Sequence, residues 1–215
     1  MKIMTISSVT LFTICLLISF CDAKVLKDFC VADYTAPQHA GGYSCKSPEK
    51  VTVDDFVYSG LATPGNTSNL IKASFPNAFS YQFPGVNGLG VTLSRGDLAP
   101  GGIIPVHSHP GVTEIILVVK GSITAGFVST ANNVYIKTLE EGDIFAVPQG
   151  LIHFGVNTGP SQALVFASFS DENPGVQVTD LALFGNNFPT DLVSKTTFLD
   201  PAVIKKLKAV FGGSG

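Results

Sequence analysis

Three of the chain's four histidines and one glutamate fall in a pattern that could hold a metal ion. His107 and His109 stand two residues apart, Glu114 follows shortly after them, and His153 comes some forty residues later. Neutral imidazoles and one carboxylate suit a borderline divalent cation, and ligation from a few strands leaves coordination positions open. These ligand types alone fit manganese, iron, zinc, copper and nickel. We therefore treat the four residues as a candidate site for one divalent metal.

Each of these residues also has an ordinary interpretation. A single glutamate in a strand is usually exposed, and a single histidine is usually a hydrogen-bonded, partly buried side chain, which is how we interpret His39. Glu114, however, lies in the strongly apolar run 113–119, where an unpaired carboxylate is costly to bury. A metal ion would compensate this charge. The four residues together therefore favour a site over four unrelated side chains.

Short strands and turns must position these side chains. Residues two apart in an extended segment point to the same face, so His107 and His109 are expected to reach the same point. Pro110 and Gly111 then turn the chain into the strand that begins near Glu114. A second turn–strand–turn unit over 142–150 precedes His153. A barrel rich in hairpins would bring this returning strand beside the first.

The rest of the chain supports an all-β fold. Between residues 51 and 178, short apolar runs alternate with turn residues, and no strand–helix alternation appears. Runs of this length rich in β-branched and aromatic residues predict an antiparallel barrel or sandwich. The expected strands cover 89–94, 113–119, 123–128, 134–139, 144–147 and 163–169.

Only the C-terminus has the pattern of a helix. Asp200 can cap it and Pro201 suits its first position. An apolar stripe with helical spacing follows, formed by Val203, Ile204, Leu207, Val210 and Phe211. Three lysines lie largely off the stripe and are interpreted as a solvated face: Lys205, Lys206 and Lys208.

Composition limits the partners. The chain has 215 residues, of which 45% are hydrophobic and 13% charged, with a net charge of −3. This length suits one domain, or at most two small ones. Because no basic field is available to hold a polyanion, nucleic acid is not an expected partner.

The N-terminus predicts a secretory signal peptide over residues 1–23. Lys2 supplies its positive region, residues 9–20 its apolar region, and Cys21 and Ala23 its small residues before the cleavage point. A membrane anchor is the alternative, but a span needs about 20 apolar residues. We therefore expect a secreted protein that has no membrane partner after cleavage.

Secretion would allow a disulfide bond between two cysteines and glycosylation of one sequon. Cys15 and Cys21 leave with the signal, so Cys30 and Cys45 are the remaining pair and are expected to form a disulfide. A two-cysteine metal site is the alternative, but it lacks two further ligands nearby. Closing a loop of this size stabilises a fold by roughly 3 kcal/mol in the chain-entropy model. Asn66 begins an Asn-Thr-Ser sequon, which predicts N-glycosylation.

The candidate metal ligands also lie in two motifs of a known family. The first cupin box of germins resembles Gly101-x5-His107-x-His109-Pro110-x3-Glu114-x6-Gly121, and the second resembles Gly142-x5-Pro148-x-Gly150-x2-His153-x3-Asn157. Germin-like segments also occur at 28–33, 42–46, 65–68, 173–175 and 183–185. The likeness covers essentially the whole mature chain. The sequence thus resembles the plant germin-like proteins, a group that includes auxin-binding members.

The resemblance implies a definite architecture. It predicts an N-terminal arm over 24–50 with the Cys30–Cys45 disulfide, one cupin jelly-roll barrel over 51–180 and a C-terminal helical extension over 181–215. It further implies an apoplastic glycoprotein assembled as a homo-hexamer, a trimer of dimers whose C-terminal helices clasp neighbours. The implied cofactor is one manganese ion per chain, held by His107, His109, Glu114 and His153.

The resemblance also bears on activity. Germins proper oxidise oxalate, and the family places two asparagines near the substrate, at positions where this chain has Ser94 and Ile104. Sites built on hydrogen bonds lose much affinity when a partner is missing, so we expect oxalate oxidase activity to be absent or weak. Superoxide dismutation, with a role in defence or development, is the leading enzymatic expectation. The non-enzymatic alternatives are binding of a small carboxylate such as an auxin, and a storage protein.

Overall fold

The structure is a computed structural model that describes residues 28–215 with the exception of residue 40. The expected signal peptide over 1–23, with Cys15 and Cys21, lies outside the described residues. Within the described part, no helix is both long enough and apolar enough to cross a membrane.

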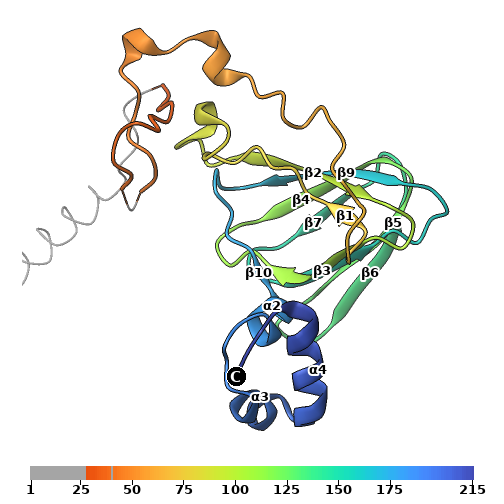
Figure 1. Ribbon diagram of the computed structural model, residues 1–215. Helices are drawn as coiled ribbons and strands as arrows, with labels where there is room; N and C mark the ends of the chain where they lie inside the picture. Colours follow the sequence, from red (N-terminus) through yellow and green to blue (C-terminus); the bar gives the residue numbers. More distant parts are fainter. Residues whose placement is uncertain (1–27, 40) are drawn as a thin grey trace, which may run out of the picture.

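Two five-stranded antiparallel sheets pack face to face as a jelly-roll barrel, as the resemblance implied (Figure 1). The first sheet has the strand order β1 (Ala73–Ser74), β2 (Thr92–Leu98), β9 (Ala163–Phe169), β4 (Glu114–Lys120) and β7 (Ile144–Val147). The second has the order β10 (Gln177–Val178), β3 (Ile103–Ser108), β8 (Ile152–Val156), β5 (Ile123–Val128) and β6 (Val134–Leu139).

Alternating side chains build the core between the sheets. In β4, Glu114, Ile116 and Val118 are buried while Ile115 and Leu117 are exposed on the outer face. The inward residues join one apolar cluster with members from both sheets, among them Leu98, Ile123, Val147 and Val165. Burial in β4 therefore alternates with the period of two of an extended strand, although its sequence is apolar from Ile115 to Val119.

The predicted strands agree closely with the observed ones, with one exception. The expected strand over 89–94 is wrong at both ends, because β2 runs from Thr92 to Leu98. Gly88 and Gly90 have φ angles of 75° and 66°, a left-handed conformation that interrupts an extended strand before Thr92. The Arg95-Gly96-Asp97 tripeptide consequently lies within the strand.

That tripeptide ties the segment around residues 61–65 to the barrel. Both Asp97 oxygens accept hydrogen bonds of 2.9 Å from the Arg95 guanidinium, and one also accepts from the Gly65 backbone N–H at 2.8 Å. Arg95 donates further to the Leu61 carbonyl. Because the Asp97 side chain is buried in this network, the tripeptide has a structural role.

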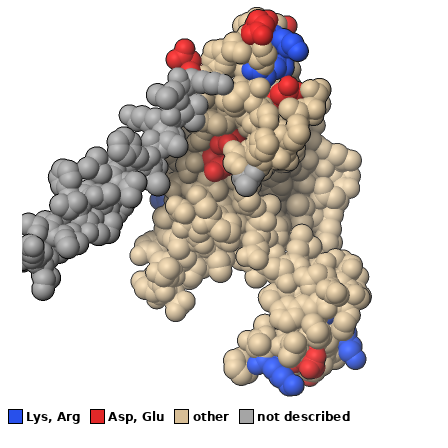
Figure 2. Space-filling view, turned by 90° about the vertical axis from the view of Figure 1, so that its left-hand side faces the viewer, with Lys and Arg blue, Asp and Glu red and all other residues tan. Residues whose placement is uncertain are grey.

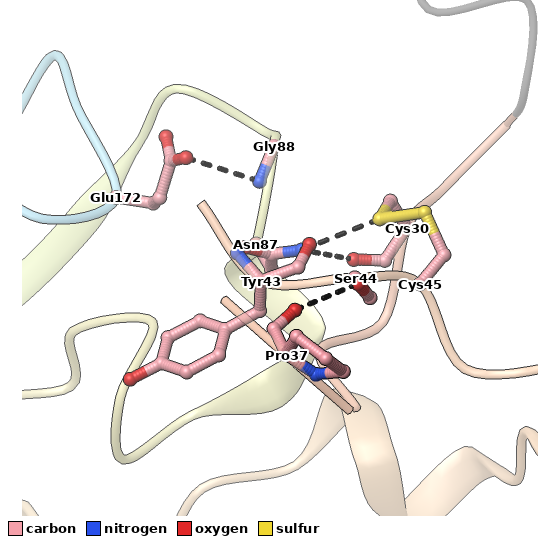
Figure 3. The surroundings of a disulfide bond; sticks show 8 residues. All are labelled: Cys30, Pro37, Tyr43, Ser44, Cys45, Asn87, Gly88 and Glu172. Atoms are coloured by element: carbon pink, nitrogen blue, oxygen red, sulfur yellow. Dashed lines mark hydrogen bonds between the residues drawn. A yellow bond between two sulfur atoms is a disulfide. The ribbon is translucent and has the colours of Figure 1, made fainter. Parts of the chain in front are cut away.

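The disulfide joins Cys30 to Cys45 as predicted, and a buried amide ties it to the barrel (Figure 3). Asn87 donates to the Cys30 and Tyr43 carbonyls, at 3.0 and 3.2 Å, and accepts from the Tyr43 N–H. The arm ends in the 3-10 helix η1 (Pro48–Lys50). A second 3-10 helix, η2 (Val53–Phe56), follows it, and a third, η3 (Pro84–Val86), precedes Asn87.

Three helices form a small cluster below the barrel in Figure 1: α2 (Thr179–Phe184), α3 (Thr190–Thr197) and α4 (Pro201–Phe211). Their shared core consists of Phe184, Val193 and Ile204. The predicted start of α4 is confirmed, since the Asp200 carboxylate accepts from the Ala202 N–H at 2.7 Å. Of the predicted apolar stripe, however, Val203 and Val210 are exposed.

The solvated-face interpretation was wrong for Lys208, which is 3% exposed. Its ammonium group donates to the backbone carbonyls of Asn186, Phe188 and Ser214, at 3.3, 2.6 and 2.6 Å. The tail after Gly212 folds back over α4, where the Gly213 and Ser214 N–H groups bond to the Lys208 and Asn186 carbonyls. This tertiary arrangement encloses the lysine, while Lys205 and Lys206 are exposed as predicted.

Candidate metal centre

The structure brings all four predicted metal ligands together inside the barrel. His107 lies on β3, His109 directly follows β3, Glu114 begins β4 and His153 lies on β8. One potential ligand atom from each lies within 4.8 Å of the others, and all four side chains are buried. Glu114 belongs to the first sheet and His107 and His153 to the second. The cluster therefore bridges the two layers.

A β-bulge in β3 aims His107 into the barrel. Ile104 pairs with Gly155 and His107 pairs with His153, so three steps along β3 match two along β8. Residues three apart in a regular strand point to opposite faces. The extra residue places both Ile104 and His107 against the interior, where both line one cavity.

Backbone carbonyls fix the tautomer of each imidazole. The Nδ1 atoms of His107, His109 and His153 lie 2.8, 2.5 and 2.9 Å from the carbonyl oxygens of Pro105, Gly175 and Leu151. A carbonyl only accepts, so each Nδ1 must carry the proton and donate. Each Nε2 is then left with a free lone pair, the arrangement that suits metal ligation.

Burial favours the neutral form of the His107 and His109 imidazoles. It lowers the pKa of His107 to about 4, with the nearby His153 as a further cause, and it also lowers the pKa of His109. Protons therefore do not compete for the Nε2 lone pairs of these two residues near neutral pH.

Two atoms at the centre of the cluster lack hydrogen-bond partners. Among the buried side-chain atoms of residues 28–39 and 41–215, only Glu114 Oε2 and His153 Nε2 make no hydrogen bond. They lie 2.9 Å apart, and His109 Nε2 is 3.7 Å from the same oxygen. Buried polar atoms are rarely left unpaired, and a cation among these lone pairs would satisfy both. The donor set thus fits a divalent metal.

The other predicted residues lie away from this centre. His39 lies on the N-terminal arm, outside the cluster, but its ordinary interpretation as a partly buried side chain is wrong, because the structure has it exposed. Asn66 is exposed, and its side-chain oxygen accepts from the Ser68 N–H at 2.9 Å. Its predicted glycosylation stays a prediction.

A cavity of about 710 Å³ opens from the metal ligands toward the C-terminal helices. Its walls are mainly apolar and include Phe79, Ile104, Ile116 and Phe169. Both positions at which germins proper carry an asparagine, Ser94 and Ile104, line this cavity.

Asn77 also lines the cavity, and sequence reasoning missed it. It precedes β2 and pairs with Ser94 through a single β-bridge. No periodic or motif signal marks this residue, because its place depends on how the segment before η3 folds back onto β2.

Comparison with known proteins supports these observations. The model of the Cupin family matches residues 59–205. A germin-like protein of Morus alba is 61% identical over 190 residues, which cover 88% of this chain and 91% of that protein. The auxin-binding protein ABP19a of Prunus persica is 60% identical over 203 residues, 94% of this chain and 97% of its own.

A solved structure with a similar fold is that of an oxalate oxidase in complex with the substrate analogue glycolate. It superposes with a TM-score of 0.84 at 35% sequence identity, covering 86% of this chain and 96% of the oxidase.

Proposed function

Since the chain belongs to the cupin family, among the plant germin-like proteins, we propose that it is a secreted manganese protein of the plant cell wall that dismutes superoxide. The observation that carries this proposal is the buried convergence of three Nε2 lone pairs and one carboxylate from two sheets. The family resemblance supports manganese among the metals that this donor set fits.

A bound manganese ion would supply one-electron chemistry by cycling between two oxidation states. Two superoxide anions and two protons give one dioxygen and one hydrogen peroxide. Four protein ligands leave coordination positions open for a small anion. The apolar rim near Ile104 is no obstacle to a diatomic substrate, which needs no elaborate pocket.

The histidines would hold the metal ion and would not supply protons to the reaction. The three imidazoles hold their single protons in hydrogen bonds to carbonyl groups, so they are positioned as ligands and not as proton donors. The protons taken up by peroxide would therefore enter from solvent through the cavity mouth.

We propose that oxalate oxidation is weak or absent. At position 104 a branched alkyl side chain faces the cavity, and the Ser94 hydroxyl is already hydrogen-bonded to Asn77. A dianion held beside the metal would therefore lack the two amide donors expected at these positions, and unpaired charged oxygens are costly to bury.

Secretion, glycosylation and assembly belong to the same proposal. The N-terminal signal pattern, the disulfide and the exposed sequon at Asn66 support an extracellular glycoprotein. We also propose the homo-hexamer of the family, a trimer of dimers. The exposed apolar outer face of β4 and β7 supports this assembly.

Metal analysis with parallel assays tests the enzymatic proposal. Protein secreted by a plant host should contain about one manganese per chain, dismute superoxide and leave oxalate unchanged. In His153→Ala, metal content and dismutation should both fall at least about tenfold, because one ligand is lost. His39→Ala, which removes an exposed histidine outside the cluster, should retain both. Stoichiometric manganese without dismutation would contradict the activity while leaving the site intact.

A second candidate function is binding of a small aromatic carboxylate such as an auxin. The apolar cavity that opens beside the metal ligands favours it, since a carboxylate could face the metal while a ring lies among Phe79 and Phe169. A ligand at 100 times its Kd stabilises a protein by about 2.7 kcal/mol, so indole acetate should raise the Tm. An unchanged Tm at millimolar indole acetate would exclude tight auxin binding.

A further inference from the structure

His109 differs from the other two candidate histidine ligands in the origin of its hydrogen-bond acceptor. The Nδ1 atoms of His107 and His153 each donate to the carbonyl group two residues earlier in the chain. The Nδ1 atom of His109 donates to the carbonyl group of Gly175, which lies 66 residues further along. The orientation of two rings is thus set locally, whereas that of the His109 ring depends on a distant part of the chain.

The Gly175 carbonyl belongs to the 171–176 loop, which lies between β9 and β10. The Ser80 N–H donates to the Glu172 carbonyl at 2.8 Å, and the Gly88 N–H donates to the Glu172 carboxylate at 3.3 Å (Figure 3). At the other end of the loop, β10 is paired with β3. The loop is therefore anchored to the barrel on both sides of Gly175.

Pro174 fixes the middle of this loop. It is buried and lines the cavity beside the metal ligands, while Gly175 and Val176 after it are exposed. The proline ring also fixes one backbone dihedral angle, which limits the conformations that the loop can adopt. His109 is only 6% exposed, and its ring packs against Phe169 with 4.9 Å between the ring centroids. The loop therefore holds an acceptor against the Nδ1 edge of a buried ring.

A change of tautomer would turn His109 from a metal ligand into a hydrogen-bond partner of Glu114. Its Nε2 atom is 3.7 Å from Glu114 Oε2, which accepts no hydrogen bond within the described chain. If the Gly175 carbonyl moved away, a proton on Nδ1 would lose its acceptor, whereas a proton on Nε2 would gain a carboxylate, the stronger acceptor. That second tautomer has no lone pair at Nε2 to offer to a metal ion.

We propose that the 171–176 loop controls metal retention by holding His109 in its ligand tautomer. With the loop in place, Nδ1 carries the proton and the Nε2 lone pair is free for the metal. With the loop displaced, the proton is carried by Nε2 and only the other three ligands remain. Pro174 and Gly175 are thus positioning residues that act through His109. This inference rests on the metal-binding function proposed above and adds the element that regulates it.

The tautomer of His109 in the metal-free protein tests this role directly. Pro174→Gly removes the buried ring and frees the loop without altering a ligand. Solid-state NMR of protein with isotope-labelled histidines distinguishes protonated from unprotonated ring nitrogens at about pH 8, where the imidazoles are neutral. In the wild type, all three cluster histidines should carry the proton on Nδ1. In Pro174→Gly, His109 alone should gain a population protonated on Nε2.

Metal affinity supplies the second readout. Competition with a chelator should give a manganese dissociation constant about tenfold higher in Pro174→Gly than in the wild type, as expected when a ligand loses its outer hydrogen bond. Pro160→Gly is the matched control, because Pro160 is exposed in the loop between β8 and β9. It should change neither the tautomer of His109 nor the dissociation constant.

Glu172→Ala keeps the test decisive if Pro174→Gly fails to fold. It removes only the carboxylate that accepts from the Gly88 N–H, so it should shift both readouts in the same direction by a smaller amount. A His109 ring that stays protonated on Nδ1 in the folded loop variants overturns the proposal. An unchanged manganese dissociation constant in these variants overturns it as well.

The two readouts separate this inference from the proposed function. A wild type that binds no manganese would contradict the proposed function. The tautomers of the metal-free protein would still decide the role of the loop, because they are measured without a metal.

Discussion

Hydrogen bonds at the Nδ1 atoms, away from the centre of the cluster, orient the three candidate histidine ligands. Each Nδ1 proton is held by a backbone carbonyl, and burial lowers the pKa values of His107 and His109. Individual residues thus enter the folded protein as neutral ligands with a defined tautomer. This preparation lowers the proton competition that a metal must overcome.

The metal-free protein should lose stability as the pH falls below neutrality. The pKa of His107 is about 4 in the folded protein and about 6.5 in an unfolded chain, so the unfolded chain binds more protons between these values. Stability is therefore complete above about pH 6.5 and falls by on the order of 3 kcal/mol as the pH drops to about 4. Urea unfolding of chelator-treated protein at several pH values measures this change in the free energy of unfolding.

The variant His107→Asn tests whether this pH dependence of stability arises from the histidine cluster. His107→Asn cannot take up the proton and should show a shallower decline over the same range, while His39→Ala should retain the wild-type slope. Equal slopes in wild type and His107→Asn would show that other groups cause the loss.

Single elements show where sequence reasoning succeeds and where it stops. The bounds of β5, β6, β7 and β9 were predictable because each is a short apolar run with turn residues that mark both ends locally. The ligand set was predictable because its motif spacing is long and specific. The bulge in β3 and the pairing of Asn77 with Ser94 were not, since both depend on a partner strand far along the chain.

Lys208 gives a prediction for the C-terminal helices. Its ammonium group donates to three backbone carbonyls, and within the described chain only that of Asn186 has a second donor, the Ser214 N–H. Lys208→Met should therefore leave the Phe188 and Ser214 carbonyls without this donor and destabilise the helical cluster by about 1–3 kcal/mol. Lys205→Met, which changes an exposed lysine on the same helix, should have little effect. Hydrogen exchange of α4 amides compares the two, and equal protection in both variants would contradict the role of Lys208.

On the scale of the whole molecule, charge and apolar surface are segregated. In Figure 2 most of the visible charged side chains gather at the N-terminal arm and at the C-terminal helices, and the barrel between them carries few. The outer face of the first sheet exposes Ile115, Leu117, Val119 and Ile144, the last to 67%. An apolar face of this kind is typical of a surface that another chain covers.

A charge on this face should disrupt the proposed hexamer. Ile144→Lys would bury an unpaired ammonium group in an interface, so the variant should sediment as smaller species than the wild type. Asn133→Lys adds the same charge at an exposed turn and should not change the sedimentation coefficient. If the wild type itself sediments as a monomer, the hexamer is wrong for this chain.

The four candidate ligands come from both sheets, and this has a consequence for the order of sheet docking and metal binding. Glu114 and the histidines of β3 and β8 meet only after the sheets have docked, because the chain between His107 and His153 supplies strands to both layers. A nascent or half-closed chain thus has no complete coordination sphere to offer. A cation that needs all four ligands would therefore bind only after the barrel has closed.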